Sequence, residues 1–121
     1  MNLQFLEFDS SEDSEGVVCW DALSQPAAHH TLAMLQEVTE LLAWAHRYAT
    51  SDPGPLEDGA DWDFDLQIHD GHASIEVHWN SVRQKLDLSK TPSASTEITL
   101  SLSLSGTRSF AGAFREHWNT P

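Results

Sequence analysis

The chain has 121 residues, which is the length of one domain and short for two independent hydrophobic cores. Hydrophobic residues make up 40% of it, enough for a packed core, while 19 acidic side chains against 6 Lys and Arg give a formal charge of −13. This charge disfavours binding to nucleic acid and to anionic lipid surfaces. We therefore expect a single domain over residues 1–121 whose partners are neither nucleic acids nor membranes.

Several functional classes lack their sequence signatures here. No uninterrupted apolar run of about 18 residues and no basic-then-apolar leader is visible, so we expect a soluble, cytoplasmic protein. The single Cys19 excludes an internal disulfide and a cysteine-rich zinc module, and its place between Val18 and Trp20 predicts a buried, unreactive thiol. Glycine-rich nucleotide loops and the H-E-x-x-H and G-x-S-x-G motifs are absent, which favours a non-catalytic protein.

The N-terminal third predicts two strands and a long helix. Apolar and aromatic residues at 3–8 and 17–23 predict strands, and the acidic stretch from Asp9 to Gly16 predicts an exposed loop between them. This loop lacks the glycine and glutamate positions of an EF-hand, so calcium binding is disfavoured. Apolar residues then recur at spacings of three and four, which predicts a helix over residues 26–50. His46 falls near its C-terminus, where protonation is favoured.

A β-hairpin is predicted in the middle of the chain. Residues 61–69 alternate between apolar and polar, Asp70 and Gly71 suit a two-residue type I′ turn, and a second alternating run covers 73–79. A loop of Asp70 and Gly71 pairs every apolar residue with another apolar residue. The predicted pairs are Trp62 with Trp79, Phe64 with Val77, Leu66 with Ile75, and Ile68 with Ala73.

The remaining elements complete an α+β fold. Alternating runs at 82–88 and 98–105 predict a further antiparallel pair, and Phe110, Phe114 and Trp118 recur at the spacing of a short C-terminal helix. The predicted order is ββ-α-ββββ-α, a largely antiparallel sheet with the long helix and the C-terminal helix packed on one face. The order of the strands within the sheet is left open.

The polar side of the predicted hairpin carries the strongest functional indication. The same register places Asp61 opposite Asn80, Asp63 opposite His78, and Asp65 opposite Glu76. Directly opposed side chains have Cβ atoms about 4.5–5.5 Å apart, so Asp65 and Glu76 would repel each other. A nearby cation, a basic partner or a shared proton would relieve this repulsion.

Three interpretations follow from this cluster of charges. In the first, Arg83 and Lys85 on the next strand neutralise an ordinary solvated surface. In the second, which we favour, a small acidic protein-binding module docks a basic protein partner, with exposed edges of Trp62 and Trp79 as anchors and no cofactor. The docking residues would be Glu57, Asp58, Asp61, Asp63, Asp65 and Glu76. The alternative is a divalent metal held by Asp63, Asp65, Glu76 and His78, in a metal-binding or metal-dependent hydrolytic protein.

Overall fold

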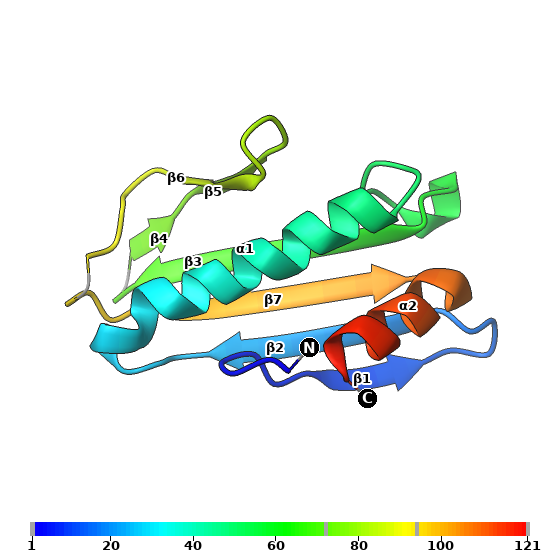
Figure 1. Ribbon diagram of the computed structural model, residues 1–121, viewed down its shortest axis with the longest axis horizontal. Helices are drawn as coiled ribbons and strands as arrows, with labels where there is room; N and C mark the ends of the chain where they lie inside the picture. The colour runs from blue at the N-terminus through cyan, green and yellow to red at the C-terminus, as the bar shows by residue number, and fades with distance from the viewer. Residues whose placement is uncertain (1, 72, 94, 121) are drawn as a thin grey trace.

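The computed structural model describes residues 2–71, 73–93 and 95–120 and has the predicted α+β fold and element order, with the predicted strand at 73–79 divided into two strands (Figure 1). Two strands precede the long helix, five strands follow it, and a short helix ends the chain. The elements are β1 (Asp9–Glu12), β2 (Val18–Ser24), α1 (Thr31–Tyr48), β3 (Trp62–Asp70), β4 (Ala73–Ile75), β5 (Val77–Asn80), β6 (Lys85–Leu88), β7 (Thr99–Gly106) and α2 (Arg108–Trp118), with 3-10 turns η1 (Ala28–His30) and η2 (Leu56–Asp58).

Five of the strands form one antiparallel sheet in the order β1-β2-β7-β3-β4, and β5 and β6 form a separate pair. The predicted pairing of residues 82–88 with 98–105 is wrong, because β7 lies between β2 and β3. Leu100, Leu102 and Leu104 of β7 are almost completely buried there. Side-chain alternation predicts which face of a strand is buried, but not which strands lie along its two edges.

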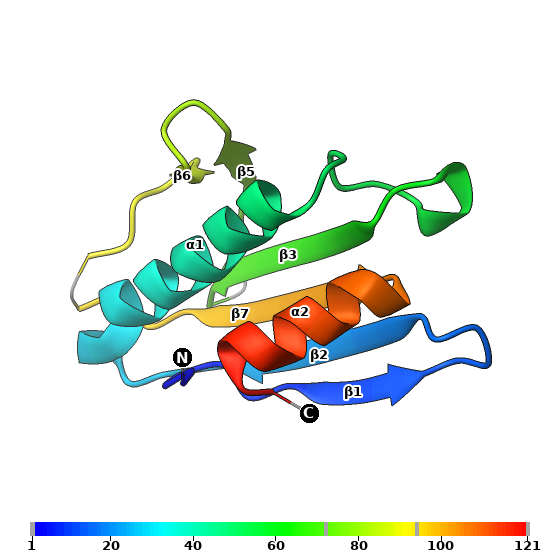
Figure 2. The ribbon, with the colours of Figure 1, turned by 45° about the vertical axis from the view of Figure 1, so that its right-hand side comes forward.

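Both helices cover the same face of the sheet, as predicted (Figures 1 and 2). The even-numbered residues of β2, β7 and much of β3 point toward them, and Trp20, Leu102 and Trp62 are fully buried. Met34, Val38, Leu41, Leu42 and Ala45 form the buried stripe of α1. The 3.6-residue period of α1 and the two-residue period of the strands thus meet in one hydrophobic core.

Residues 2–8 differ from the prediction, because they lie outside any strand and β1 begins only at Asp9. Leu6 and Phe8 are buried in the core, while the backbone N–H groups of Phe5 and Leu6 donate to the Glu37 carboxylate at 2.9 and 2.8 Å. A helix side chain therefore satisfies donors that a neighbouring strand would otherwise bind. The acidic segment predicted to be a loop supplies the edge strand instead, since an edge strand tolerates polar side chains on both faces.

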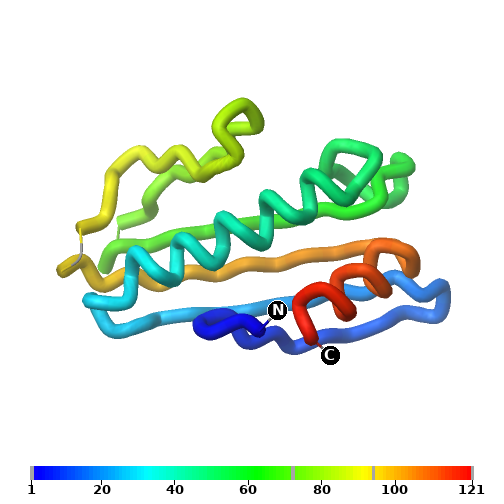
Figure 3. The backbone as a smooth tube through the Cα atoms, viewed as in Figure 1, coloured from blue at the N-terminus to red at the C-terminus, as the bar shows by residue number. Residues whose placement is uncertain are grey.

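The predicted hairpin exists, but its register is wrong. The observed pairs are Ile68 with Ile75, His69 with Ser74, and Asp70 with Ala73, so the turn lies one residue later than predicted. This displacement shifts every partner by two residues, which leaves each side chain on its predicted face. Pairing also ends at Ile75, because the chain turns away into β5 and pairs with β6 (Figure 3).

His46 anchors the β5–β6 pair to α1. Its ring stacks on Trp79 with centroids 4.7 Å apart, and its Nδ1 donates to the Leu42 carbonyl at 2.7 Å. Burial lowers the pKa of His46 below its ordinary value of 6.5, although the Leu42 carbonyl and Asp52 oppose this shift. The direction of the pKa shift is therefore opposite to the predicted preference of His46 for protonation, since desolvation outweighs the Leu42 hydrogen bond and the charge of Asp52.

We expect acidification to destabilise the fold through His46. Its pKa is lower in the folded state than in the unfolded chain, so the unfolded state binds more protons as the pH falls below about 6.5. Between about pH 7.5 and 5.5, His46→Gln should lose less unfolding free energy than the wild type does. Urea unfolding at both pH values measures this difference, with His29→Gln, an exposed histidine, as the control. Equal losses in wild type and His46→Gln would contradict the assignment.

Candidate functional site

No helix of the described residues covers the second face of the sheet (Figure 2). The strand register places mostly polar residues on that face. Strand alternation places the odd-numbered residues of β1, β2, β3 and β7 there. Serines and threonine occupy the central strand β7, and carboxylates occupy the strands on both sides of it. We call Asp9, Asp21, Asp63 and Asp65 the acidic face.

The strand register aligns these residues in two neighbouring rows across the sheet. One row runs from Asp9 to Asp21, Ser103 and Asp65, and the next from Ser11 to Cys19, Ser105 and Asp63. The short serine side chains leave a hollow of about 330 Å³ between the carboxylates of β2 and those of β3. Asp21, Asp63 and Asp65 line this hollow, and Ser103 Oγ donates to Asp21 Oδ1 at 2.7 Å.

Among the described strand residues, the acidic face has no Lys or Arg to neutralise it, although His69 of β3 lies on the same side of the sheet. The ion pairs found elsewhere join Lys90 to Asp70 at 2.6 Å and Arg115 to Glu12 at 3.6 Å. Four carboxylates therefore share one surface whose attraction for cationic groups is not compensated locally.

The predicted docking residues divide among several places. Asp63 and Asp65 lie on the acidic face, whereas Glu57 and Asp58 are exposed in η2, ahead of β3. Asp61 holds the start of β3 in place, because its carboxylate accepts from Thr50 Oγ1 at 2.9 Å and from Ser51 Oγ at 3.5 Å.

The predicted opposition of Asp65 and Glu76 is wrong. Asp65 pairs with Ser103 of β7, and Glu76 follows the end of β4, where its N–H donates to Ser89 Oγ at 3.0 Å. Lys85 lies on β6, which pairs with β5 and not with β3, so it does not serve as the neighbouring-strand cation of the first interpretation.

Neither tryptophan matches the expected docking anchor. Trp62 is 0% exposed and stacks on Phe110 with ring centroids 5.6 Å apart. Trp79 is half-buried against His46. Trp62 belongs to the hydrophobic core, and Trp79 packs against it from β5. Neither ring lies on the uncovered face of the sheet.

The four residues proposed as metal ligands do not form one set. Asp63 and Asp65 point from β3 to the uncovered face, whereas Glu76 and His78 follow the chain out of the sheet toward β5 and β6. Within residues 2–71, 73–93 and 95–120, no group of three or more His, Cys, Asp and Glu side chains could hold a metal ion. Metal sites need convergent ligands, so this geometry offers the metal alternative no support.

Sequence reasoning missed Asp9 and Asp21, and it placed Cys19 wrongly. Cys19 is exposed and lines the acidic hollow, because the buried positions of β2 are the even ones. The alternation at 17–23 already placed Cys19 and Asp21 on one side of a strand, opposite Trp20. The sequence did not show that β1 begins at Asp9, nor that β7 lies between β2 and β3 and so places their polar side chains on one surface.

We expect removal of one charge from the pair Asp9 and Asp21 to stabilise the fold slightly. These carboxyl-bearing residues lie directly opposite each other on β1 and β2, and like charges in that position are destabilising. Asp9→Asn should raise the unfolding free energy by about 0.2–1 kcal/mol, and more at low salt than at high salt. Thermal unfolding at two salt concentrations tests this, with the exposed Glu7→Gln as control. A loss of stability in Asp9→Asn would contradict the repulsion.

Comparison with known proteins adds no relative: no protein-family model, curated protein or solved structure matches this chain. No helix in the described part of the chain is long and apolar enough to cross a membrane.

Proposed function

We propose that the protein is a small cytoplasmic binding module, of the adaptor or inhibitor kind, that docks a basic protein partner through the acidic face. The observation that carries this proposal is that Asp21, Asp63 and Asp65 line a hollow on the uncovered face of the sheet, with Asp9 opposite Asp21 and no Lys or Arg among the described strand residues of that face. A Lys or Arg side chain of a partner fits such a hollow in both size and charge. The formal net charge of the chain, −13, accelerates encounter with a basic surface.

The shape of the face supports protein binding over binding of a small molecule. The hollow is shallow, and the serines of β7 present a flat central strip on which another protein surface can approach closely. Electrostatic docking of this kind weakens as salt rises, because exposed charges are screened within about 8–10 Å at physiological ionic strength.

Affinity capture from a lysate of the host, at low and at moderate salt and with or without EDTA, tests the proposal. The wild type should retain one basic protein at low salt, lose it as salt rises, and behave identically with EDTA. The triple variant Asp21→Asn, Asp63→Asn, Asp65→Asn should fail to retain it. A matched variant, Glu7→Gln, Glu40→Gln, Glu97→Gln, removes three exposed charges that are not among the predicted docking residues and should behave like the wild type.

Modification of Cys19 provides an independent test of the same face. Its thiol is exposed in the hollow and is the only cysteine in the chain, so a bulky maleimide labels this position selectively. The labelled protein should lose the basic partner, whereas a Cys19→Ser variant treated with the same reagent should keep it. Docking at the acidic face would be contradicted if both charge variants lost the partner equally, or if the partner were retained only with metal. Full binding of the partner by the labelled protein would contradict it as well.

A further inference from the structure

The outer edge of β3 is open along most of its length, although β5 lies close to it. β4 pairs only with residues 68–70 of β3, and the chain then leaves to form β5, which pairs with β6 (Figures 1 and 3). The outer edge of β3 from Trp62 to Gln67 therefore has no strand beside it among the described residues.

Two hydrogen bonds show which backbone groups point to this open edge. The Asp61 carbonyl accepts from Thr107 N–H on the β7 side, and the Trp62 carbonyl accepts from Gly54 N–H on the outer side. Backbone groups alternate along a strand, so Phe64 and Leu66 direct theirs to the outer edge. Phe64 N–H donates to Asp63 Oδ1 at 2.9 Å. The Leu66 N–H, the Leu66 carbonyl and the Phe64 carbonyl have no partner within the described chain.

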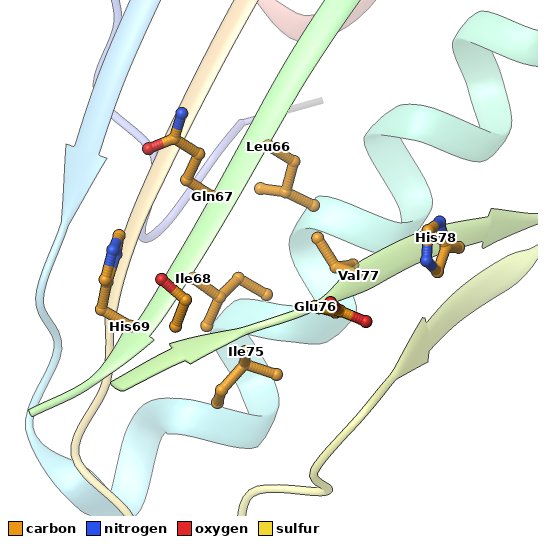
Figure 4. A pocket seen from close by; sticks show the side chains of 9 residues that line it. Leu66, Gln67, Ile68, His69, Ile75, Glu76, Val77 and His78 are labelled. Atoms are coloured by element: carbon orange, nitrogen blue, oxygen red, sulfur yellow. The ribbon is translucent and has the colours of Figure 1, made fainter. Parts of the chain in front are cut away.

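The facing strand presents a second row of such groups. Ser89 N–H donates to the Glu76 carbonyl at 2.9 Å, which marks the even-numbered residues of β5 as those bonded to β6. Val77 and Trp79 therefore direct their backbone groups away from β6. Figure 4 shows β5 between β3 and β6, so these groups point toward the β3 side.

A groove lies between the two strands. It consists of adjoining hollows of about 680 and 250 Å³ that share Leu66, Val77 and His78 as lining residues. Leu66 points toward Val77 across the space between the strands (Figure 4). The charged residues among those lining it are Asp65 and Glu76, both exposed and both acidic.

We propose that this groove binds an extended segment of a partner protein, added as a β-strand on the edge of β3, with alternating apolar and basic side chains. Unpaired backbone groups on an edge select an extended peptide, and the pockets beside them select its side chains. The peptide residue opposite Leu66 directs an apolar side chain between Leu66 and Val77. Its neighbours point to the other face, where Asp65 attracts Lys or Arg. This groove shares Phe64 and Asp65 with the hollow between β2 and β3 but lies along the other edge of β3, so the proposal does not depend on docking in that hollow.

Synthetic peptides that alternate Lys with Val, Leu, Ile or Phe provide the probe. Fluorescence anisotropy at low salt should show saturable binding of at least one of them to the full chain. N-methylation of alternate residues blocks one hydrogen-bonding edge of a peptide and leaves its side chains intact. Methylation of at least one edge should weaken binding about tenfold or more, because two or more backbone hydrogen bonds are lost.

Charge variants and amide exchange locate the bound peptide. Asp65→Asn with Glu76→Gln should weaken binding, whereas Asp9→Asn with Asp21→Asn, which alters only the acidic face, should leave it unchanged. The Leu66 amide should exchange rapidly in the free protein and become protected with peptide. Absence of binding by every peptide would overturn the proposal. So would methylated forms that both bind as tightly as the parent peptide, or loss of binding in the Asp9 and Asp21 variant. A Leu66 amide that is already protected without peptide would also overturn it, since β5 or a second copy would then occupy the edge.

Discussion

Trp62→Ala should lower the unfolding free energy by about 3–5 kcal/mol, the largest effect that we expect from a single substitution. Trp62 is fully buried, and its indole stacks on Phe110 and on Phe64, with centroids 5.6 and 5.4 Å away. The His46 ring meets it edge-on at 4.9 Å. Truncation to Ala therefore leaves a cavity bounded by β3, α1 and α2, which a close-packed interior fills only in part.

Two further variants serve as controls for Trp62→Ala. Leu23→Ala, at a position 73% exposed, should change stability by no more than about 0.5 kcal/mol in the same urea titration. Trp62→Phe should cost less than Trp62→Ala, because it keeps an aromatic ring and removes an indole N–H that is buried without a partner in the described structure. A loss below about 1 kcal/mol for Trp62→Ala would show that the tryptophan is not in the core, and exposure of Trp62 as a docking anchor would be open again.

Glu37→Gln should lower the unfolding free energy by about 2–3 kcal/mol. The Glu37 carboxylate on α1 accepts from the N–H groups of Gln4, Phe5 and Leu6, which no strand binds. Charge-assisted hydrogen bonds are about twice as strong as neutral ones, and a glutamine amide accepts through only one oxygen. The substitution therefore leaves part-buried backbone donors unpaired.

The same substitution should release residues 2–8 before the rest of the fold. Amide exchange at Phe5 and Leu6 should accelerate in Glu37→Gln, while that of the β7 residues changes only with global stability. Glu40→Gln, an exposed glutamate three residues further along α1, is the control and should have little effect. Unchanged exchange at Phe5 and Leu6 would contradict the anchoring role of Glu37.

The elements were predictable where the signal is local. The helix from 26 to 50 contains α1, and the alternating run at 98–105 corresponds closely to β7, because both depend on side-chain spacing within a few residues. The hairpin was found from its turn residues, yet its register was wrong by one turn position, since Asp70 belongs to β3 and pairs with Ala73. Both registers keep every side chain on the same face, so the apolar pattern could not distinguish between them.

Local sequence patterns also identified only part of the candidate site. Asp63 and Asp65 were recognised because they alternate with apolar residues on one strand, but their predicted partners Glu76 and His78 lie beyond the end of the pairing. Asp9 and Asp21 join them only because β7 lies between β2 and β3, where Ser103 pairs with Asp21 from 82 residues further along the chain. No local pattern connects residues at such a separation.

The sequence by itself determined much of the core, the apolar sides of α1, α2, β3 and β7, and the strongly acidic character of the chain. Those properties depend on side-chain chemistry and on periods of 2 and 3.6 residues, which are local. Only the tertiary structure decided the order of the strands, the point where β3 and β4 separate, and the set of carboxylates that share one surface. These depend on which backbone edges meet, and backbone N–H and C=O groups are the same in every strand, so packing of the whole chain has to choose among them.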